Sequence, residues 1–73
     1  MKRGNLMWSK ELINTSRKLL NISGVSVKSL DGNFGVLQIG DIEPKYMICF
    51  YDENKTVSFK SIDEIINAGW AVD

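Results

Sequence analysis

The chain has 73 residues, of which 44% are apolar and 25% are charged, and its formal net charge is zero. This length predicts one domain, residues 1–73, that buries about 60% of its unfolded surface on folding. The chain has no histidine and a single cysteine, Cys49. These counts exclude Cys/His metal sites, intramolecular disulfides and Ser-His-Asp triads. No apolar run approaches the roughly 18 residues of a membrane span, so we expect a cytoplasmic protein.

The first element expected in the chain is a helix over residues 8–20. Ser9 suits its N-cap, and the segment 21–24, which ends in Gly24, stops it. Apolar residues share one side of this helix and basic residues share the other. These are Trp8, Leu12 and Leu19 against Lys10 and Arg17.

Four strands are predicted after this helix. Asp31-Gly32, a dipeptide typical of tight hairpin turns, separates the first two strands. Gly35, inside the second strand, indicates a bulge or a close packing contact. The third strand is apolar on both faces, which favours a central position or a face offered to a partner. The strands span residues 25–30, 34–39, 46–51 and 56–60.

The closing segment predicts a short helix. Ser61 and Glu64 form a capping box, in which Ser61 is the N-cap and Glu64 follows three residues later. Gly69 ends the helix as its C′ residue. Trp70 and Val72 lie beyond the helix, and we expect both to fold back against the sheet.

These elements predict a small α+β domain in the order α-β-β-β-β-α. The connections between strands are too short for crossover helices, so neighbouring strands should be antiparallel. The simplest arrangement is a four-stranded antiparallel meander with the N-terminal helix packed across one face. The short C-terminal helix should cover an edge or the end of that face.

A partner-binding surface is the first candidate site. One of two sets on the third strand needs a second cover, either Tyr46, Ile48 and Phe50 or Met47, Cys49 and Tyr51. The C-terminal segment with Trp70 is one cover, and another chain is the other. The predicted contact residues are Tyr46, Ile48, Phe50, Tyr51 and Trp70.

A basic stripe near the N-terminus is the second candidate site. Residues 1–28 carry a net charge of +5 and residues 29–73 a net charge of −5. The stripe could contact the phosphates of a nucleic acid, or it could be a solvated helix face. Its members are Lys2, Arg3, Lys10, Arg17 and Lys18.

No catalytic, cofactor-binding or metal-binding residues are predicted. Cys49 has no histidine to activate it, and its apolar strand favours a small core residue. We therefore expect a small non-enzymatic module that binds another protein or a second copy of itself. The size, the missing histidine and the missing site fit a phage or mobile-element regulator or inhibitor. The alternative is a nucleic-acid-binding accessory protein that uses the basic helix.

Overall fold

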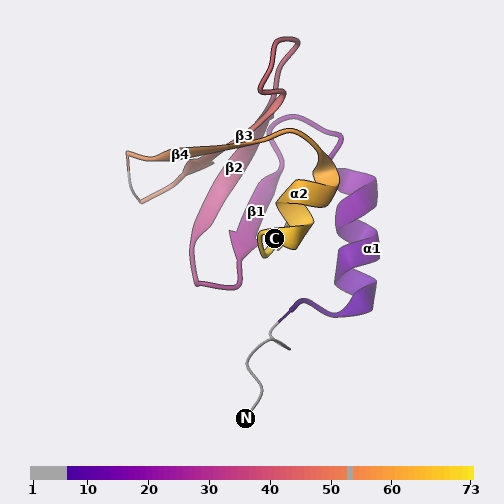
Figure 1. Cartoon of the computed structure of the whole chain (residues 1–73). Helices are drawn as coiled ribbons and strands as arrows, with labels where there is room; N and C mark the ends of the chain where they lie inside the picture. The colour runs from indigo at the N-terminus through magenta and orange to yellow at the C-terminus, as the bar shows by residue number, and fades with distance from the viewer. Residues whose placement is uncertain (1–6, 53) are drawn as a thin grey trace.

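The computed structural model describes residues 7–52 and 54–73, and it shows two helices and one antiparallel sheet (Figure 1). The five strands lie in the order β4-β3-β2-β1-β5. The elements in chain order are α1 Lys10–Leu19, β1 Ser26–Ser29, β2 Phe34–Ile39, β3 Tyr46–Phe50, β4 Thr56–Phe59, α2 Ile62–Asn67 and β5 Trp70–Val72.

The fifth strand, β5, is the main departure from the predicted four-stranded meander. Trp70–Val72 pairs antiparallel with β1, with Val72 opposite Val27 and Trp70 opposite Ser29. The predicted fold-back of Trp70 and Val72 therefore places them within the sheet as an edge strand. The meander β1 to β4 has the predicted order, and α2 carries the chain from the β4 edge to the β5 edge.

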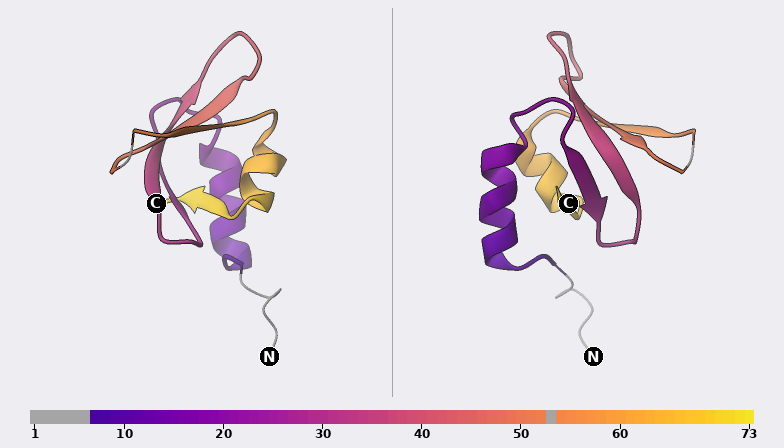
Figure 2. Two further views of the ribbon diagram at one scale, coloured as in Figure 1. Left: turned by 60° about the vertical axis from the view of Figure 1, so that its left-hand side comes forward. Right: turned by 180° about the vertical axis from the view of Figure 1, so that it is seen from behind.

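The position of α1 also differs from the expected packing across one face. The helix lies alongside β5 and also touches α2, and it makes no comparable contact with β2 or β3. In Figures 1 and 2 α1 lies on the far side of α2 from β3 and β4, α2 follows directly on the end of β4, and β3 and β4 turn away from the direction of β1 and β2. The sheet is therefore curled, with its β4 edge far from α1.

Local sequence signals explain how both helices begin and end. The Ser9 hydroxyl accepts a hydrogen bond from the Leu12 N–H at 3.2 Å, and the Ser61 hydroxyl accepts one from the Glu64 N–H at 3.2 Å. Both serines are therefore N-caps, as predicted. The Glu64 carboxylate closes the box one residue early, because it accepts from the N–H of Lys60. Gly69, at φ +97°, ends α2 in the left-handed conformation that glycine adopts readily.

The core lies on the inner face of the curled sheet. Five apolar side chains of the core cluster are completely buried, and Trp70 in the same cluster is 5% exposed. Trp70 meets the Phe50 ring edge to face, with centroids 5.4 Å apart. β1, β2, β3, α2 and β5 each supply one of these six buried side chains, and the sixth comes from Leu20, the residue that follows α1. They are Leu20, Val27, Leu37, Ile48, Ile65 and Trp70.

Gly35 provides the close contact that its position in the second strand predicts. A Cβ atom at Gly35 would lie 2.6 Å from the carbonyl oxygen of Cys49 and 2.9 Å from a methyl group of Ile48. Because one of these neighbours is backbone of β3, the contact cannot be relieved by a rotamer change. Glycine at this position lets β2 and β3 approach over the core.

Candidate interaction surface

The side of the sheet that faces away from the core carries the candidate surface. Side chains alternate along each strand, and residues paired across strands point the same way. Leu37 and Ile48 are paired and buried, so the neighbouring pairs, Val36 with Cys49 and Gln38 with Met47, point outward. We call this side the outer face. It carries Ser26, Lys28, Phe34, Val36, Gln38, Met47, Cys49, Thr56 and Ser58.

An apolar patch occupies the middle of the outer face. Phe34 is 46% exposed, Met47 is 37% exposed and Tyr51 is 58% exposed, while Val36 and Cys49 are half-buried beside them. We call these five residues the outer patch. Helix α2 packs on the inner side, where its Ile65 belongs to the core, and α1 contacts β5 and α2, so no helix in the described residues covers the patch.

Tyr51 is held across this patch by its hydroxyl group. Its backbone N–H donates to the Phe34 carbonyl at 3.0 Å, which places Tyr51 beside the first residue of β2. Its phenol oxygen lies 3.0 Å from the Ser26 Oγ on β1. Because Ser26 pairs with Val36, the ring must extend across β2 to reach it. The hydrogen bond therefore keeps a large exposed ring in one orientation.

The sequence left open which of two sets of third-strand residues is buried, and the structure assigns one set to each face of the sheet. Tyr46, Ile48 and Phe50 face inward, and Met47 and Cys49 face outward. The five predicted contact residues consequently do not form one surface. Ile48 is 0% exposed and Trp70 is 5% exposed. Tyr46 and Phe50 pack partly buried against the core, and Tyr51 belongs to the outer patch.

Sequence reasoning did not include Phe34 and Val36 in the candidate surface. Phe34 and Val36 are separated by one residue, so both side chains had to leave the second strand on the same face. The other face of that strand carries Leu37, which is completely buried, and this observation assigns Phe34 and Val36 to the outside. Without a predicted register, their proximity to Met47 and Cys49 could not be inferred.

Of the predicted basic stripe, only part lies on α1 as exposed cations that are free of an ion pair in the described residues. Lys10 and Lys18 are exposed, whereas the guanidinium of Arg17 forms an ion pair with the Asp63 carboxylate in the first turn of α2. This pair joins the basic first part of the chain to the acidic second part. Lys2 and Arg3, the other members of the predicted stripe, lie outside the described residues.

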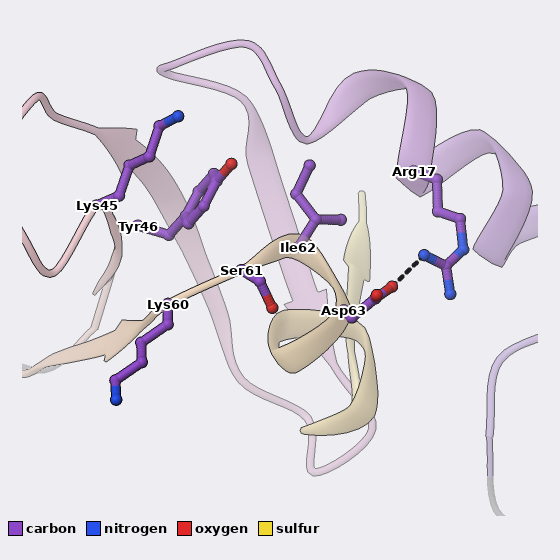
Figure 3. A pocket seen from close by; sticks show the side chains of 7 residues that line it. All are labelled: Arg17, Lys45, Tyr46, Lys60, Ser61, Ile62 and Asp63. Carbon is purple, nitrogen blue, oxygen red and sulfur yellow. Dashed lines mark hydrogen bonds and ion pairs between the residues drawn. The ribbon is translucent and has the colours of Figure 1, made fainter.

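A shallow hollow of about 360 Å³ lies where α1, α2 and the start of β3 approach one another. Figure 3 shows its side chains: Tyr46 and Ile62 stand at its centre, and Arg17 is turned toward Asp63. Lys45 and Lys60 carry their ammonium groups to opposite sides, so these cations do not converge on one point. The hollow is lined by Arg17, Lys45, Tyr46, Lys60, Ser61, Ile62 and Asp63.

Comparison with known proteins gives no relative for this chain. No family model matches it, and no curated protein or solved structure is significantly similar to it. In the described residues no helix is long and apolar enough to cross a membrane. The same residues contain no group of three or more Cys, Asp or Glu side chains placed to hold a metal ion.

Proposed function

We propose that the protein is a small non-enzymatic module that binds another protein through the outer patch. The observation that carries this proposal is an apolar group of side chains on the β2–β3 part of the outer face, which neither helix contacts. Contiguous exposed apolar surface on a small domain usually marks a site of interaction. A regulator or inhibitor that acts by occupying a partner's surface is the role that needs nothing more than such a patch.

The composition of the surface supports a protein partner. An aromatic side chain buries 150–250 Å² when covered, so the exposed fractions of Phe34 and Tyr51, 46% and 58%, leave roughly 100 Å² of each residue accessible. Methionine adapts its shape to a partner, and aromatic residues are enriched among interface residues that dominate affinity. Gln38, Thr56 and Ser58 surround the patch with exposed polar groups, as in typical interfaces.

Electrostatics on the outer face also favour an apolar contact over a phosphate contact. Lys28 is the one charged side chain on the strands of this face, and its ammonium group lies 5.2 Å from the centre of the Trp8 ring. Nucleic acid binding depends on several cations that neutralise phosphates together. On α1 the Arg17 charge is already paired with Asp63.

The test is affinity capture from cells of the source organism with three versions of the full chain. Phe34→Glu places a charge in the outer patch, whereas Ile42→Glu places one on an apolar residue that is 82% exposed in the β2–β3 loop. We expect one partner to bind the unchanged chain and Ile42→Glu but not Phe34→Glu. The identified partner, purified, should also shield Cys49 from thiol reagents.

Two results would count against this proposal. The first is a captured set of proteins that Phe34→Glu leaves unchanged while circular dichroism shows that the variant is folded. The second is a DNA or RNA mobility shift that survives Phe34→Glu and disappears when Lys10 and Lys18 are replaced by alanine. The second result would favour the nucleic-acid-binding alternative.

A further inference from the structure

The two edge strands of the sheet differ in whether their outward backbone N–H and C=O groups have hydrogen-bond partners. At the β5 edge the Val72 N–H points away from β1 and donates to the buried Oγ of Ser16 at 2.9 Å. Helix α1 lies along this strand. At the other edge, β4 pairs with β3 alone among the described residues. An unpaired edge strand is a template for another strand unless it is covered or interrupted.

The register identifies which groups of β4 face outward. The Phe50 N–H donates to the Lys55 carbonyl at 3.0 Å, so Lys55 directs its backbone toward β3. In an antiparallel ladder alternate residues do the same, which leaves Thr56 and Ser58 with their N–H and C=O groups directed away. The next outward N–H, that of Lys60, donates to the Glu64 carboxylate at 2.8 Å. The open part of the edge is therefore a two-residue window.

We propose that this window pairs with the β4 strand of a second copy of the chain. A twofold axis at Val57 places Thr56 opposite Ser58 of the second copy, and Ser58 opposite its Thr56. Each of these pairs exchanges two hydrogen bonds, because both residues direct their backbone outward. All four outward groups of each copy's window are then used, and the same surface serves on both sides, as a twofold contact requires.

The side chains of β4 are complementary to their own copy in this register. Val57, which is half-buried, meets Val57 of the second copy in a non-hydrogen-bonded pair, where side chains are closest. Thr56 and Ser58 meet as hydroxyl pairs, which are favourable across antiparallel strands. Lys55 faces Phe59 of the second copy, so no like charges are directly opposed.

The contact is small, and this sets its expected strength. A window of two residues on each chain buries less than the roughly 800 Å² per partner of a standard stable interface. Association should therefore be concentration-dependent, with a dissociation constant in the micromolar range or weaker. Because the axis is perpendicular to the sheet, both outer patches lie on the same side of the dimer. If the proposed partner carries two sites, the pairing raises its apparent affinity without any new contact.

The experiment is sedimentation equilibrium of the full chain from micromolar to millimolar concentration, with hydrogen exchange of individual amides. We expect reversible dimerisation, and amides of Thr56 and Ser58 that become protected as concentration rises. Ser58→Pro should remove the dimer while the β3–β4 ladder remains, because the N–H that is lost faces away from β3. Phe34→Glu should leave the dimer intact, so failure at the outer patch and failure at the β4 edge are distinguishable.

A charge-swap pair keeps the proposal testable if Ser58→Pro does not fold. The double variant Thr56→Lys/Ser58→Lys places like charges in opposition and should be monomeric. The corresponding double variant Thr56→Glu/Ser58→Glu should be monomeric too, and an equimolar mixture of the two should dimerise again. Gln38→Lys, which adds the same charge to the outer face of β2, should not change the association. A monomer at every concentration, or a dimer that persists in the lysine variant, would overturn the proposal.

Discussion

Replacing Ser16 with alanine should destabilise the protein, although alanine is the better helix former. Ser16 is 0% exposed, and its Oγ accepts the hydrogen bond of the Val72 N–H at 2.9 Å. Alanine leaves that N–H in a buried position without an acceptor, which costs about 1–3 kcal/mol. The improved helix propensity returns about 0.5 kcal/mol. We therefore expect a net loss of about 0.5–2.5 kcal/mol in the free energy of unfolding.

The measurement is urea denaturation followed by tryptophan fluorescence, since Trp70 is nearly completely buried beside the affected strand. For a domain of this size the denaturant slope is about 1 kcal/mol per molar urea, so the midpoint should fall by about 0.5–2.5 M. Hydrogen exchange of the Val72 amide should accelerate by more than that of core amides in β2 and β3, because the lost bond is local to the β5 edge.

Thr15→Ala is the matched control, because it removes a hydroxyl from the neighbouring, exposed position of the same helix. It should leave stability unchanged or raise it slightly. The reasoning is refuted if Ser16→Ala has the same midpoint as the unchanged chain, or if Thr15→Ala lowers the midpoint by as much.

Three further changes test other parts of the fold by the same denaturation measurement. Gly35→Ala should cost about 2–3 kcal/mol because its Cβ would meet the backbone of β3, whereas Gly40→Ala, which has open space around it, should be nearly neutral. Equal effects of the two would show that the close approach is not constraining. Ser61→Ala should cost about 1 kcal/mol through loss of the α2 cap, and an unchanged midpoint would contradict that role. A double-mutant cycle between Arg17 and Asp63 should give a coupling below about 1 kcal/mol, since both side chains are more than half exposed; a larger coupling would mean that the pair is shielded from solvent.

Local signals in the sequence predicted most of the secondary structure. The second strand was predicted with the bounds 34–39 that it has, and both serine caps and the glycine after α2 were identified correctly. These features depend on residues within four positions of one another. Such short-range rules act before any tertiary contact is known, which is why they could be read directly.

The fifth strand and the placement of α1 could not be predicted by the same rules. Three residues, Trp70–Val72, are too few to show alternation, and all three are buried. Their pairing with β1 joins residues more than 40 positions apart, and no turn specifies it. In the sequence, Ser16 shares the apolar side of α1 with Leu12 and Leu19. A hydroxyl on that side is expected to be buried and to need a hydrogen-bond partner, and the backbone N–H of Val72 is that partner.

The outer patch was predicted in part for a related reason. The third strand was correctly seen to be apolar on both sides, but choosing its buried side required the register with β2. Gly35 is consistent with Ile48 on the buried side, because a Cβ added at Gly35 would meet a methyl group of Ile48 there. The set containing Met47 and Tyr51 was weighed as one of two alternatives, and the structure assigns its members to the exposed side.

The location of β5 has a consequence for the order in which the molecule folds. The strands β1 to β4 pair through short turns and can assemble from local contacts, but the last strand must find the first one. Closing that long loop costs entropy before any contact compensates for it. Helix α1 depends on the same event, because its buried hydroxyl bonds to Val72. The first helix of the chain should therefore dock last, together with the strand that completes the sheet.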